Sequence, residues 1–480
     1  MIRQGFADRP RARACVAWSI AILSAGQVFF TGRLEAGQPR RPDSPVARGR
    51  ALFLRVWTPD DPRARGGDGL GPVFNERSCV ACHNLGGVGG AGSRSKNVDI
   101  LTITKNAPTA QGRDVDKARS ESASALPPAD DIEAMAMIHS GFAASQSLVL
   151  HRFGTAPNYE AWRQNVMVSD PPDRNSHAAS RDDASEGNRE LPESAKRGAF
   201  SLKRSQRNST SLFGAGLIDS IPDEAIDVPP RSPGIKGRPN RLKDGRIGKF
   251  GWKAQMASLD EFVTTACSVE LGLEVPGRHQ AGDPLGCERE AKQFDMTRQD
   301  CDDMVAFVRS LPTPIVRTPA NALGRKLFET IGCAACHVPK LGEVEGIYSD
   351  LMLHDLGERL QDTGGYGTFT PSRPSREDPL GSSLVRDEPK TEGAARTQPR
   401  TSAGELEWRT PPLWGVRDSA PYMHDGRAAT LEAAIDLHGA EGHEAAERFR
   451  LLSNTQQGQL IRFLQSLAAP RKATSLASSR

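Results

Sequence analysis

Two copies of the pentapeptide Cys-x-x-Cys-His constrain this chain more than any other feature of its sequence. They are Cys79–His83 and Cys333–His337. Two thiols one helical turn apart can each form a thioether to a porphyrin vinyl group. The adjacent histidine then lies under the ring as a ligand to iron. The repeated motif therefore predicts two covalently bound c-type haems.

The motif also identifies the residues that would hold the two haems. The predicted attachment residues and axial ligands are Cys79, Cys82 and His83 for the first haem, and Cys333, Cys336 and His337 for the second. A zinc site would need four ligands, whereas each motif offers three and has no second cysteine pair nearby. A thioredoxin-type redox pair would lie in a βαβ unit, and neither motif has that setting.

Composition limits the other possible functions. A chain of 480 residues corresponds to roughly two to four domains of about 150 residues each. Its 62 Lys and Arg residues nearly balance 59 Asp and Glu residues, so the net charge is only +3. A nucleic-acid partner would require a clustered basic surface. We therefore expect no nucleic-acid binding.

Three cysteines lie outside the haem motifs and the N-terminal region, at Cys267, Cys287 and Cys301. An exported chain favours one disulfide among them, with one thiol left over. Buried free thiols are the alternative. No pair outside the motifs has the spacing of a redox dithiol.

The N-terminal region is the one stretch that could meet a membrane. Four arginines precede an uncharged, largely apolar run at Ala14–Gly32. A basic flank before such a run is typical of a secretory signal or a short membrane anchor, and a buried N-terminal helix fits poorly with the arginines. We expect an exported protein, either periplasmic or attached to the membrane by this segment alone.

The periodicity of the remaining chain favours a mainly α fold with long loops. Leu259–Ala266, Met304–Val308 and Leu460–Leu467 carry apolar residues at helical spacing, while alternating strand patterns are scarce. Polar stretches that resemble linkers or surface insertions are Gly37–Pro45, Asn106–Asp130, Ser169–Glu193 and Gln361–Glu405.

A weak internal repeat suggests the domain organisation. Gly49–Phe53 is echoed by Gly324–Phe328, and each copy precedes one haem motif. We therefore expect two cytochrome-c-like haem domains with polar insertions. The expected limits are a leader and linker at 1–44, an N-terminal haem domain at 45–315, a C-terminal haem domain at 316–470 and a polar tail at 471–480.

The segment after the second motif offers a further iron ligand. Thr430 to His438 resembles a helix capped by Thr430, and Leu431, Ile435 and His438 would share one face. His438 would then point toward the core or toward a cofactor. A histidine satisfied within the core is the alternative.

The run Trp408–His438 is similar to the superfamily of bacterial dihaem cytochrome c peroxidases and tryptophan-tryptophylquinone-forming dihaem proteins. In that superfamily a Pro-Tyr-x-His-Asp-Gly motif follows the second haem. The whole chain most resembles the branch called "dihaem oxidoreductase, putative peroxidase", also labelled predicted thiol oxidoreductase. The resembling segments are Phe74–Gly90, Leu150–Arg163, Leu212–Ile226, Phe250–Gly272, Phe307–Pro314, Ile347–Gly357 and Trp408–Gly442.

The resemblance implies different ligands for the two irons. The residue fourteen after the His-Asp-Gly histidine is a methionine ligand in the peroxidases and a tyrosine in the quinone-forming relative, and here it is His438. This implies a bis-histidine C-terminal haem of lower potential than a His/Met haem, with Met423 as the rival ligand. The peroxidases' switchable distal histidine, sixteen residues after the first motif histidine, is replaced by Asp99. The first iron would then have an open sixth position or a later ligand.

Several residues are candidates for the pockets of the two haems. His139 and His151 could lie on the distal side of the first haem, and His151, Arg152 or Glu160 could carry protons there. His424, Arg409 and Arg427 are expected at the second haem, where guanidinium groups could pair with propionates. Surface or core positions are the alternative for each of these residues.

The resemblance implies a peroxidase-like oxidoreductase. Electrons would pass from the C-terminal haem to a reactive N-terminal haem, which would reduce hydrogen peroxide or accept electrons from another small substrate. The donor would be a redox partner protein or a small molecule. The alternative is a dihaem electron-transfer cytochrome that turns over no substrate.

Overall fold

The computed structural model describes residues 44–106, 128–170, 191–229, 232–286, 293–316, 322–366 and 403–470. The expected leader at 1–44, except Ser44, and the tail at 471–480 lie outside these residues, as do Cys287 and most of the four polar stretches. Among the described helices, none has the length and apolar character needed to cross a membrane.

The described helices are short to medium in length. They are α1 (Pro45–Leu54), α2 (Cys79–Cys82), α4 (Ala129–Ile138), α5 (Tyr159–Val166), α6 (Ala215–Ser220), α7 (Asp223–Ile226), α8 (Leu259–Glu270), α9 (Arg298–Arg309), α10 (Ala322–Thr330), α11 (Leu431–Asp436), α12 (His443–Leu451) and α13 (Asn454–Ser466).

The described strands are mostly short. They are β1 (Val73–Phe74), β2 (Val98–Lys105), β3 (Ser147–Leu150), β4 (Phe153–Gly154), β5 (Ser194–Arg197), β6 (Phe200–Arg207), β7 (Ile315–Val316), β8 (Lys340–Leu341), β9 (Val344–Glu345), β10 (Leu353–Asp355), β11 (Glu407–Arg409) and β12 (Leu467–Ala468).

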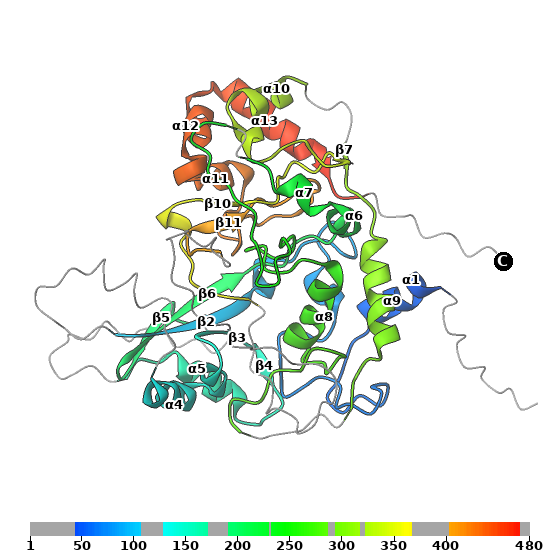
Figure 1. Ribbon diagram of the computed structural model, residues 1–480, viewed down its shortest axis with the longest axis vertical. Coiled ribbons are helices and arrows are strands. Elements are labelled where there is room, and N and C mark those ends of the chain that lie inside the picture. Colours follow the sequence, from blue (N-terminus) through cyan, green and yellow to red (C-terminus); the bar gives the residue numbers. More distant parts are fainter. Residues whose placement is uncertain are drawn as a thin grey trace, which may run out of the picture. The chain divides into compact units, whose positions relative to one another are not determined.

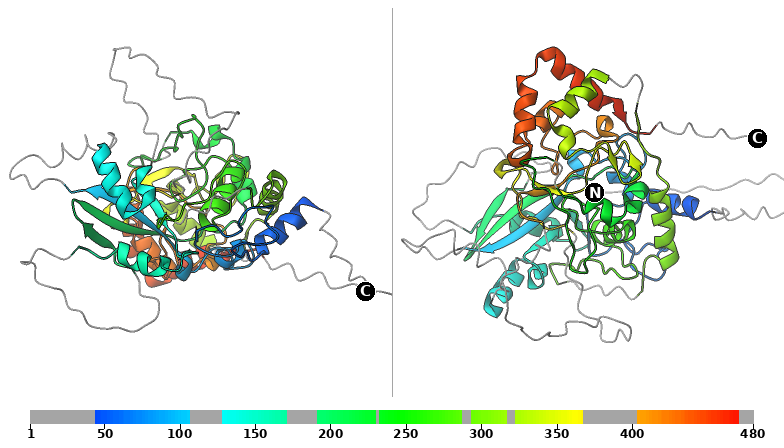
Figure 2. Two further views of the ribbon diagram at one scale, coloured as in Figure 1. Left: turned by 90° about the horizontal axis from the view of Figure 1, so that it is seen from below. Right: turned by 45° about the horizontal axis from the view of Figure 1, so that its top comes forward.

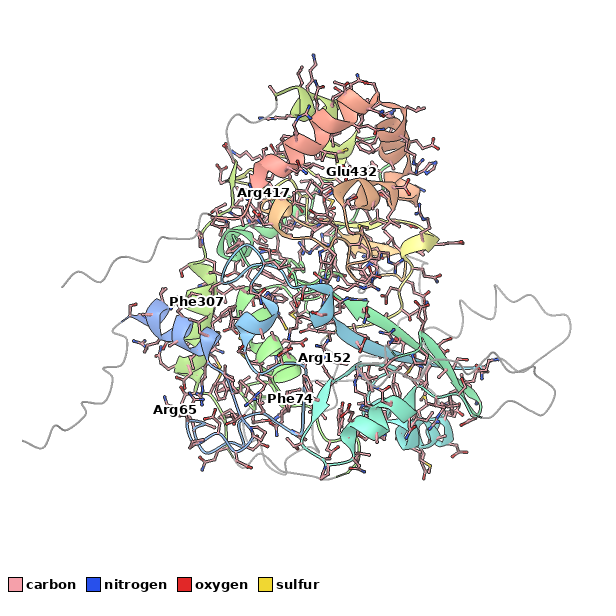
Figure 3. The ribbon with its side chains drawn as sticks, turned by 180° about the vertical axis from the view of Figure 1, so that it is seen from behind. Arg65, Phe74, Arg152, Phe307, Arg417 and Glu432 are labelled. Atoms are coloured by element: carbon pink, nitrogen blue, oxygen red, sulfur yellow. The ribbon has the colours of Figure 1, made fainter. Side chains whose placement is uncertain are left out.

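The sequence repeat corresponds to a repeated pair of crossing helices. Helix α1 packs on α9, and α10 packs on α13 (Figure 1). In the first pair Phe53 meets Phe307 with ring centres 5.2 Å apart, and Figure 3 shows Phe307 where α9 lies against α1. In the second pair Phe328 meets Phe463 at 5.4 Å. Residues 45–315 and 316–470 therefore each contain one copy of this arrangement.

Glycine is required where the helices cross. A Cβ atom on Gly49 would lie 1.8 Å from the backbone oxygen of Asp303, and one on Gly324 would lie 2.1 Å from that of Gln459. Both distances are far below van der Waals contact, so any side chain would push the helices apart. The shared glycine of the two sequence copies is thus explained by helix packing.

We expect Gly324→Ala to lower the free energy of unfolding by about 1–3 kcal/mol, because the added methyl group overpacks the crossing of α10 and α13. Gly458→Ala, within α13, is the matched control. Its Cβ would meet only the end of the Arg462 side chain, at 3.3 Å, and alanine favours a helix by up to about 1 kcal/mol. Thermal unfolding should show a lower midpoint for Gly324→Ala alone, and equal midpoints would contradict the packing argument.

A four-stranded antiparallel sheet, ordered β3-β2-β6-β5, makes the expectation of a mainly α chain only partly right. Helices α4 and α5 lie against this sheet in Figures 1 and 2. Together they form a core that contains Leu101, Ile103, Met135, Leu148, Leu150, Val166, Met167 and Leu202.

Sequence analysis did not predict the sheet because charged residues interrupt the alternation of apolar and polar residues in its strands. In β6 the buried positions Phe200 and Leu202 are followed by Arg204, which is also buried. Its guanidinium Nη1 lies 2.9 Å from Asp99 Oδ1 on β2. A buried arginine paired with a carboxylate occupies a position where a strand pattern predicts an apolar residue.

Candidate functional site

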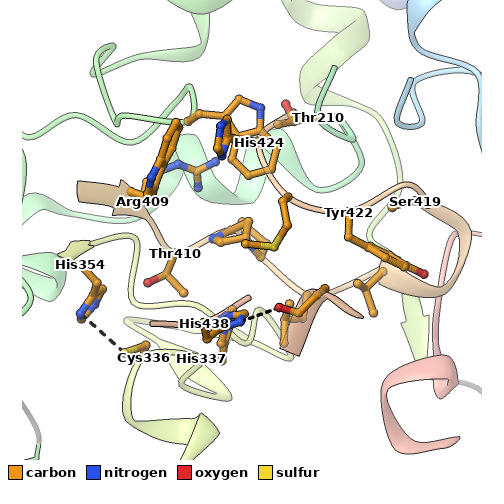
Figure 4. A pocket seen from close by; sticks show the side chains of 18 of the residues that line it. Thr210, Cys336, His337, His354, Arg409, Thr410, Ser419, Tyr422, His424 and His438 are labelled. Atoms are coloured by element: carbon orange, nitrogen blue, oxygen red, sulfur yellow. Dashed lines mark hydrogen bonds between the residues drawn. The ribbon is translucent and has the colours of Figure 1, made fainter. Parts of the chain in front are cut away.

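The second Cys-x-x-Cys-His motif lies at a large cavity in the C-terminal half of the chain (Figure 4). The predicted cofactor residues that line it are Cys333, Cys336, His337, His424, His438 and Arg409. The rival ligand Met423 lines it as well. Residues far apart in the sequence are thus brought to one site.

Two histidine rings lie close together in this cavity, with their planes at 61° to each other. The ring centres of His337 and His438 are 6.5 Å apart, and Figure 4 shows the two rings together. Metal–imidazole bonds of about 2.0–2.1 Å, with about 1.1 Å from the nitrogen to the ring centre, would place two opposed ligand rings about 6.3 Å apart. The observed spacing fits one metal ion between the two rings.

The hydrogen bonds of both rings leave one nitrogen free for a metal. His337 Nδ1 donates to the backbone oxygen of Tyr348, and His438 Nδ1 donates to that of Ala434, each at 2.9 Å. A carbonyl oxygen only accepts, so the proton is on Nδ1 and the lone pair is on Nε2. Burial lowers the pKa of His337 to about 4 and also lowers that of His438. Burial thus favours the neutral form of both rings, which is the form that binds a metal.

The short helix α11 places His438 as the sequence predicted. Thr430 caps the helix by accepting a hydrogen bond from the Ala433 backbone N–H at 3.2 Å. His438 follows the end of the helix, and its ring turns back to the Ala434 carbonyl of the last turn, which also accepts a hydrogen bond from the Leu437 backbone N–H at 3.3 Å.

Arg409 is a buried arginine that could pair with a buried anion. Its side chain is buried, and Nε donates to the Gly251 oxygen at 2.8 Å. Its Nη1 has no hydrogen-bond partner within the described structure, and burial lowers its pKa to about 10. A haem propionate at this position would satisfy the open donor.

His424 also lines the cavity, but its ring is held by contacts with Trp408 and Asp362. Its ring stacks on Trp408 with centres 3.8 Å apart, and its Nε2 lies 3.4 Å from Asp362 Oδ2. The predicted pocket residue Arg427 is instead exposed and does not line the cavity. It pairs with Asp425 at 2.6 Å, because the turn directs it to the surface.

A second group of potential metal ligands consists of Cys336, Asp350 and His354. Their potential ligand atoms lie within 4.8 Å of one another, so the distances alone would allow a metal ion. Both nitrogens of His354 are already engaged, with Asp350 at 3.0 Å and Glu441 at 2.8 Å. Burial alone would lower the pKa of His354, but these bonds raise it to about 12. A protonated ring has no lone pair to offer, so the cluster does not fit a metal site.

The first motif lies at a separate cavity, lined by Cys79, Cys82 and His83. Like His337, His83 has an Nδ1 that donates to a backbone oxygen, here that of Gly90 at 3.1 Å. The backbone of Thr210 also interacts with this ring, and burial lowers its pKa to about 4. The repeated phenylalanines also match: Phe53 lies 6.4 Å from the His83 ring, and Phe328 lies 6.4 Å from the His337 ring. Among the described residues that line this cavity, His83 is the sole histidine.

The structure does not bring His139 or His151 to this cavity. His139 accepts a hydrogen bond from the Gly141 backbone N–H at 3.0 Å and packs against Trp162 beside the sheet. His151 Nε2 donates to the Val269 oxygen at 2.8 Å. One nitrogen of each ring is thus engaged by a backbone group, and neither ring lines the cavity, so neither histidine lies on the distal side of the first haem as sequence analysis suggested.

The other proton-carrier candidates also lie outside the cavity lining. Arg152, which is labelled in Figure 3, donates to the Ser95 oxygen at 2.6 Å. Glu160 is exposed on α5. Asp99, which replaces the family's distal histidine, is on β2 and pairs with Arg163 at 2.5 Å. The position at which the family has its distal histidine therefore lies within strand β2 in this chain.

Two residues that sequence analysis missed line the N-terminal cavity together. They are Glu270, at the end of α8, and Tyr366. The Tyr366 hydroxyl donates to Glu270 Oε1 at 2.5 Å. Glu270 could have been found, because it shares a helix face with Val263 and Cys267. Tyr366 carried no signal, since it lies in a polar stretch interpreted as a linker.

Trp252 and Asn208 line both cavities. The indole Nε1 of Trp252 donates to the Asn208 backbone oxygen at 2.9 Å. These two residues therefore form part of the wall that separates the two sites. The remaining described cysteines, Cys267 and Cys301, are buried free thiols, as one of the two sequence interpretations expected.

The C-terminal part of the chain matches a known protein family. Residues 377–467 match the family described as "Di-haem oxidoreductase, putative peroxidase", which confirms the resemblance inferred from the sequence.

Three curated proteins are similar over part of their length. Methylamine utilization protein MauG of Methylorubrum extorquens is 27% identical over 151 residues, which covers 30% of this chain and 33% of that protein. Hydrazine synthase subunit gamma of Kuenenia stuttgartiensis is 27% identical over 166 residues, covering 31% and 41%. Cytochrome-c peroxidase IdrP2 of Denitromonas iodatirespirans is 26% identical over 151 residues, covering 28% and 36%. The aligned part is thus about a third to two fifths of these relatives.

Two solved structures are distantly similar. Hydrazine synthase of Kuenenia stuttgartiensis gives a TM-score of 0.29 at 21% identity, covering 55% of this chain and 73% of that one. A MauG-like protein associated with microbial copper homeostasis gives 0.25 at 17% identity, covering 54% and 81%.

Proposed function

From the premise that the chain belongs, through residues 377–467, to the di-haem oxidoreductase family, we propose that it is a peroxidase-like dihaem c-type cytochrome. One haem would be attached through Cys79 and Cys82 and the other through Cys333 and Cys336. Haem iron held by the chain would supply electron exchange and, where a coordination position is open, binding of small oxygen-containing ligands.

The observation that carries the proposal is the difference between the two cavities. The C-terminal cavity presents two histidines, His337 and His438, whose ring centres are 6.5 Å apart and whose Nδ1 atoms bond to backbone oxygens. This favours an iron that both histidines would hold and that would only transfer electrons. The described lining of the N-terminal cavity presents one histidine, together with Glu270. This favours an iron with an open sixth position beside a group that can hold a proton at its carboxylate.

The chain's own residues support transfer between the two sites. Arg409 would neutralise a propionate at the C-terminal cavity, and Trp252 would fill the space between the cavities. We propose that electrons flow from the C-terminal to the N-terminal site. They would come from a redox partner protein or a small donor, and hydrogen peroxide or another small oxidant would be reduced at the N-terminal site. We also propose that the protein is exported, in the periplasm or at the membrane.

A cyanide titration of the oxidised holoprotein tests the proposal. Cyanide should perturb one haem at low concentration and leave the other unchanged, because an iron held by two imidazoles must first lose a ligand. Absorption spectroscopy follows both haems at once. The response should be lost in the double variant Cys79→Ala/Cys82→Ala. If the wild type does not respond, or the response survives in that variant, the protein is better described as an electron carrier.

A further inference from the structure

We propose that Tyr366, which comes from the C-terminal half of the chain, is a positioning residue of the N-terminal cavity that holds Glu270 as its proton-carrying group. This inference rests on the proposed function. It assigns a role to a residue outside both haem motifs and some 280 positions beyond the first of them. It also implies that neither half of the chain holds a complete N-terminal site.

The segment that carries Tyr366 is fixed to the N-terminal half by buried contacts. Arg207, on β6, forms a bidentate ion pair with Asp362 at 2.5 and 3.1 Å and donates to the Gly364 oxygen at 2.6 Å. The backbone N–H of Gly365 donates to Ser147 Oγ, on β3, at 2.8 Å. Contacts with β3 and β6 therefore position Tyr366 at the cavity.

The Tyr366 side chain has two separable contacts. Its ring packs against a cluster of Val98, Val149 and Val269, and its hydroxyl donates to Glu270 Oε1. A phenylalanine would keep the ring contact and remove only the hydrogen bond. The hydroxyl can therefore be tested without loss of packing.

Two donors hold the Glu270 carboxylate in place. Tyr366 donates to Oε1 at 2.5 Å, and Asn75 Nδ2 donates to Oε2 at 2.8 Å. Each oxygen keeps a lone pair that can accept a further proton. The carboxylate therefore has a fixed orientation in the cavity and can take a proton from a small acid that enters it.

Opposing influences set the proton affinity of Glu270. Burial raises its pKa, while the bonds from Tyr366 and Asn75 and the charge of Arg152 lower it. Glu76, which pairs with Lys96, lines the same cavity. Because a hydrogen bond to the charged form lowers a pKa, removal of the tyrosine hydroxyl should raise the pKa of Glu270 further.

The pH dependence of cyanide binding to the oxidised holoprotein measures this effect. Hydrogen cyanide must lose its proton to bind iron, so a carboxylate in the cavity should speed binding and a carboxylic acid should not. In the wild type the binding rate should fall as the pH falls through the pKa of Glu270. Glu270→Gln should bind slowly, with no such midpoint.

Tyr366→Phe should move the midpoint to higher pH by about 0.5–1 unit, since one hydrogen bond contributes about 1 kcal/mol and one pKa unit is 1.36 kcal/mol. Tyr159→Phe is the matched control, because Tyr159 is also buried but donates to the His151 oxygen, at 2.8 Å, outside the cavity. It should leave the midpoint unchanged. Two covalent haems in each variant would show that it folds.

The outcomes separate this inference from the proposed function. If the wild type binds no cyanide, both are overturned. If the wild type binds with a Glu270-dependent midpoint that is the same in Tyr366→Phe, only the role of Tyr366 is overturned. A midpoint shift of equal size in Tyr159→Phe would also overturn it, because the effect would not be specific to the cavity.

Discussion

The double variant Cys79→Ala/Cys82→Ala should carry one covalent haem where the wild type carries two. The physical reason is that each motif lies at its own cavity, with its own histidine and its own phenylalanine contact. Loss of one pair of thioethers should therefore leave the other haem in place. Intact-mass spectrometry after expression with haem-maturation machinery gives the number directly.

Cys267→Ala is the matched control for this experiment. Cys267 lines the same cavity as Cys79 but lies outside the motif, so its removal should leave both haems attached. A wild-type stoichiometry of one or zero would overturn the assignment of two c-type haems. Two covalent haems in the double variant would show that other residues attach the cofactor.

Substitutions of His438 should have the second largest effect, on the C-terminal haem alone. His438→Met should keep that haem low-spin and raise its reduction potential on the order of 0.1 V, because a thioether ligand favours the reduced iron. It should also add a sulfur-to-iron charge-transfer band. His438→Ala should instead produce a high-spin C-terminal haem. Redox titration followed by absorption measures both effects.

His443→Ala controls for general disturbance of this region. His443 is an exposed residue at the start of α12 and should change neither spectrum nor potential. If His438→Ala leaves the C-terminal haem unchanged, another residue is its ligand. Met423, which also lines the cavity, would be the first to test.

Local patterns predicted the parts of the structure that depend on nearby residues. The haem motifs and the helix-face position of His438 required only short spacings, and the structure places these residues at cavities. The repeat at Gly49 and Gly324 proved to mark equivalent helix crossings. Such features were accessible because one helix or one turn brings the relevant side chains together.

Features that depend on residues far apart in the sequence could not be predicted from such local patterns. His139 and His151 were chosen for their type and position, yet one nitrogen of each ring bonds to a backbone group and neither ring lines the cavity. Tyr366 reaches Glu270 across 96 positions of the chain. No short-range pattern marks such a pair, because the contact depends on how a loop is fixed to the sheet.

Electron paramagnetic resonance of the oxidised holoprotein tests the central claim, that the two haem sites differ in coordination, most directly. We expect one low-spin signal, from the haem held by His337 and His438, and one high-spin signal of equal amount, from the haem beside Glu270 and Tyr366. Two low-spin signals with no high-spin component would contradict it, because both irons would then already have six ligands.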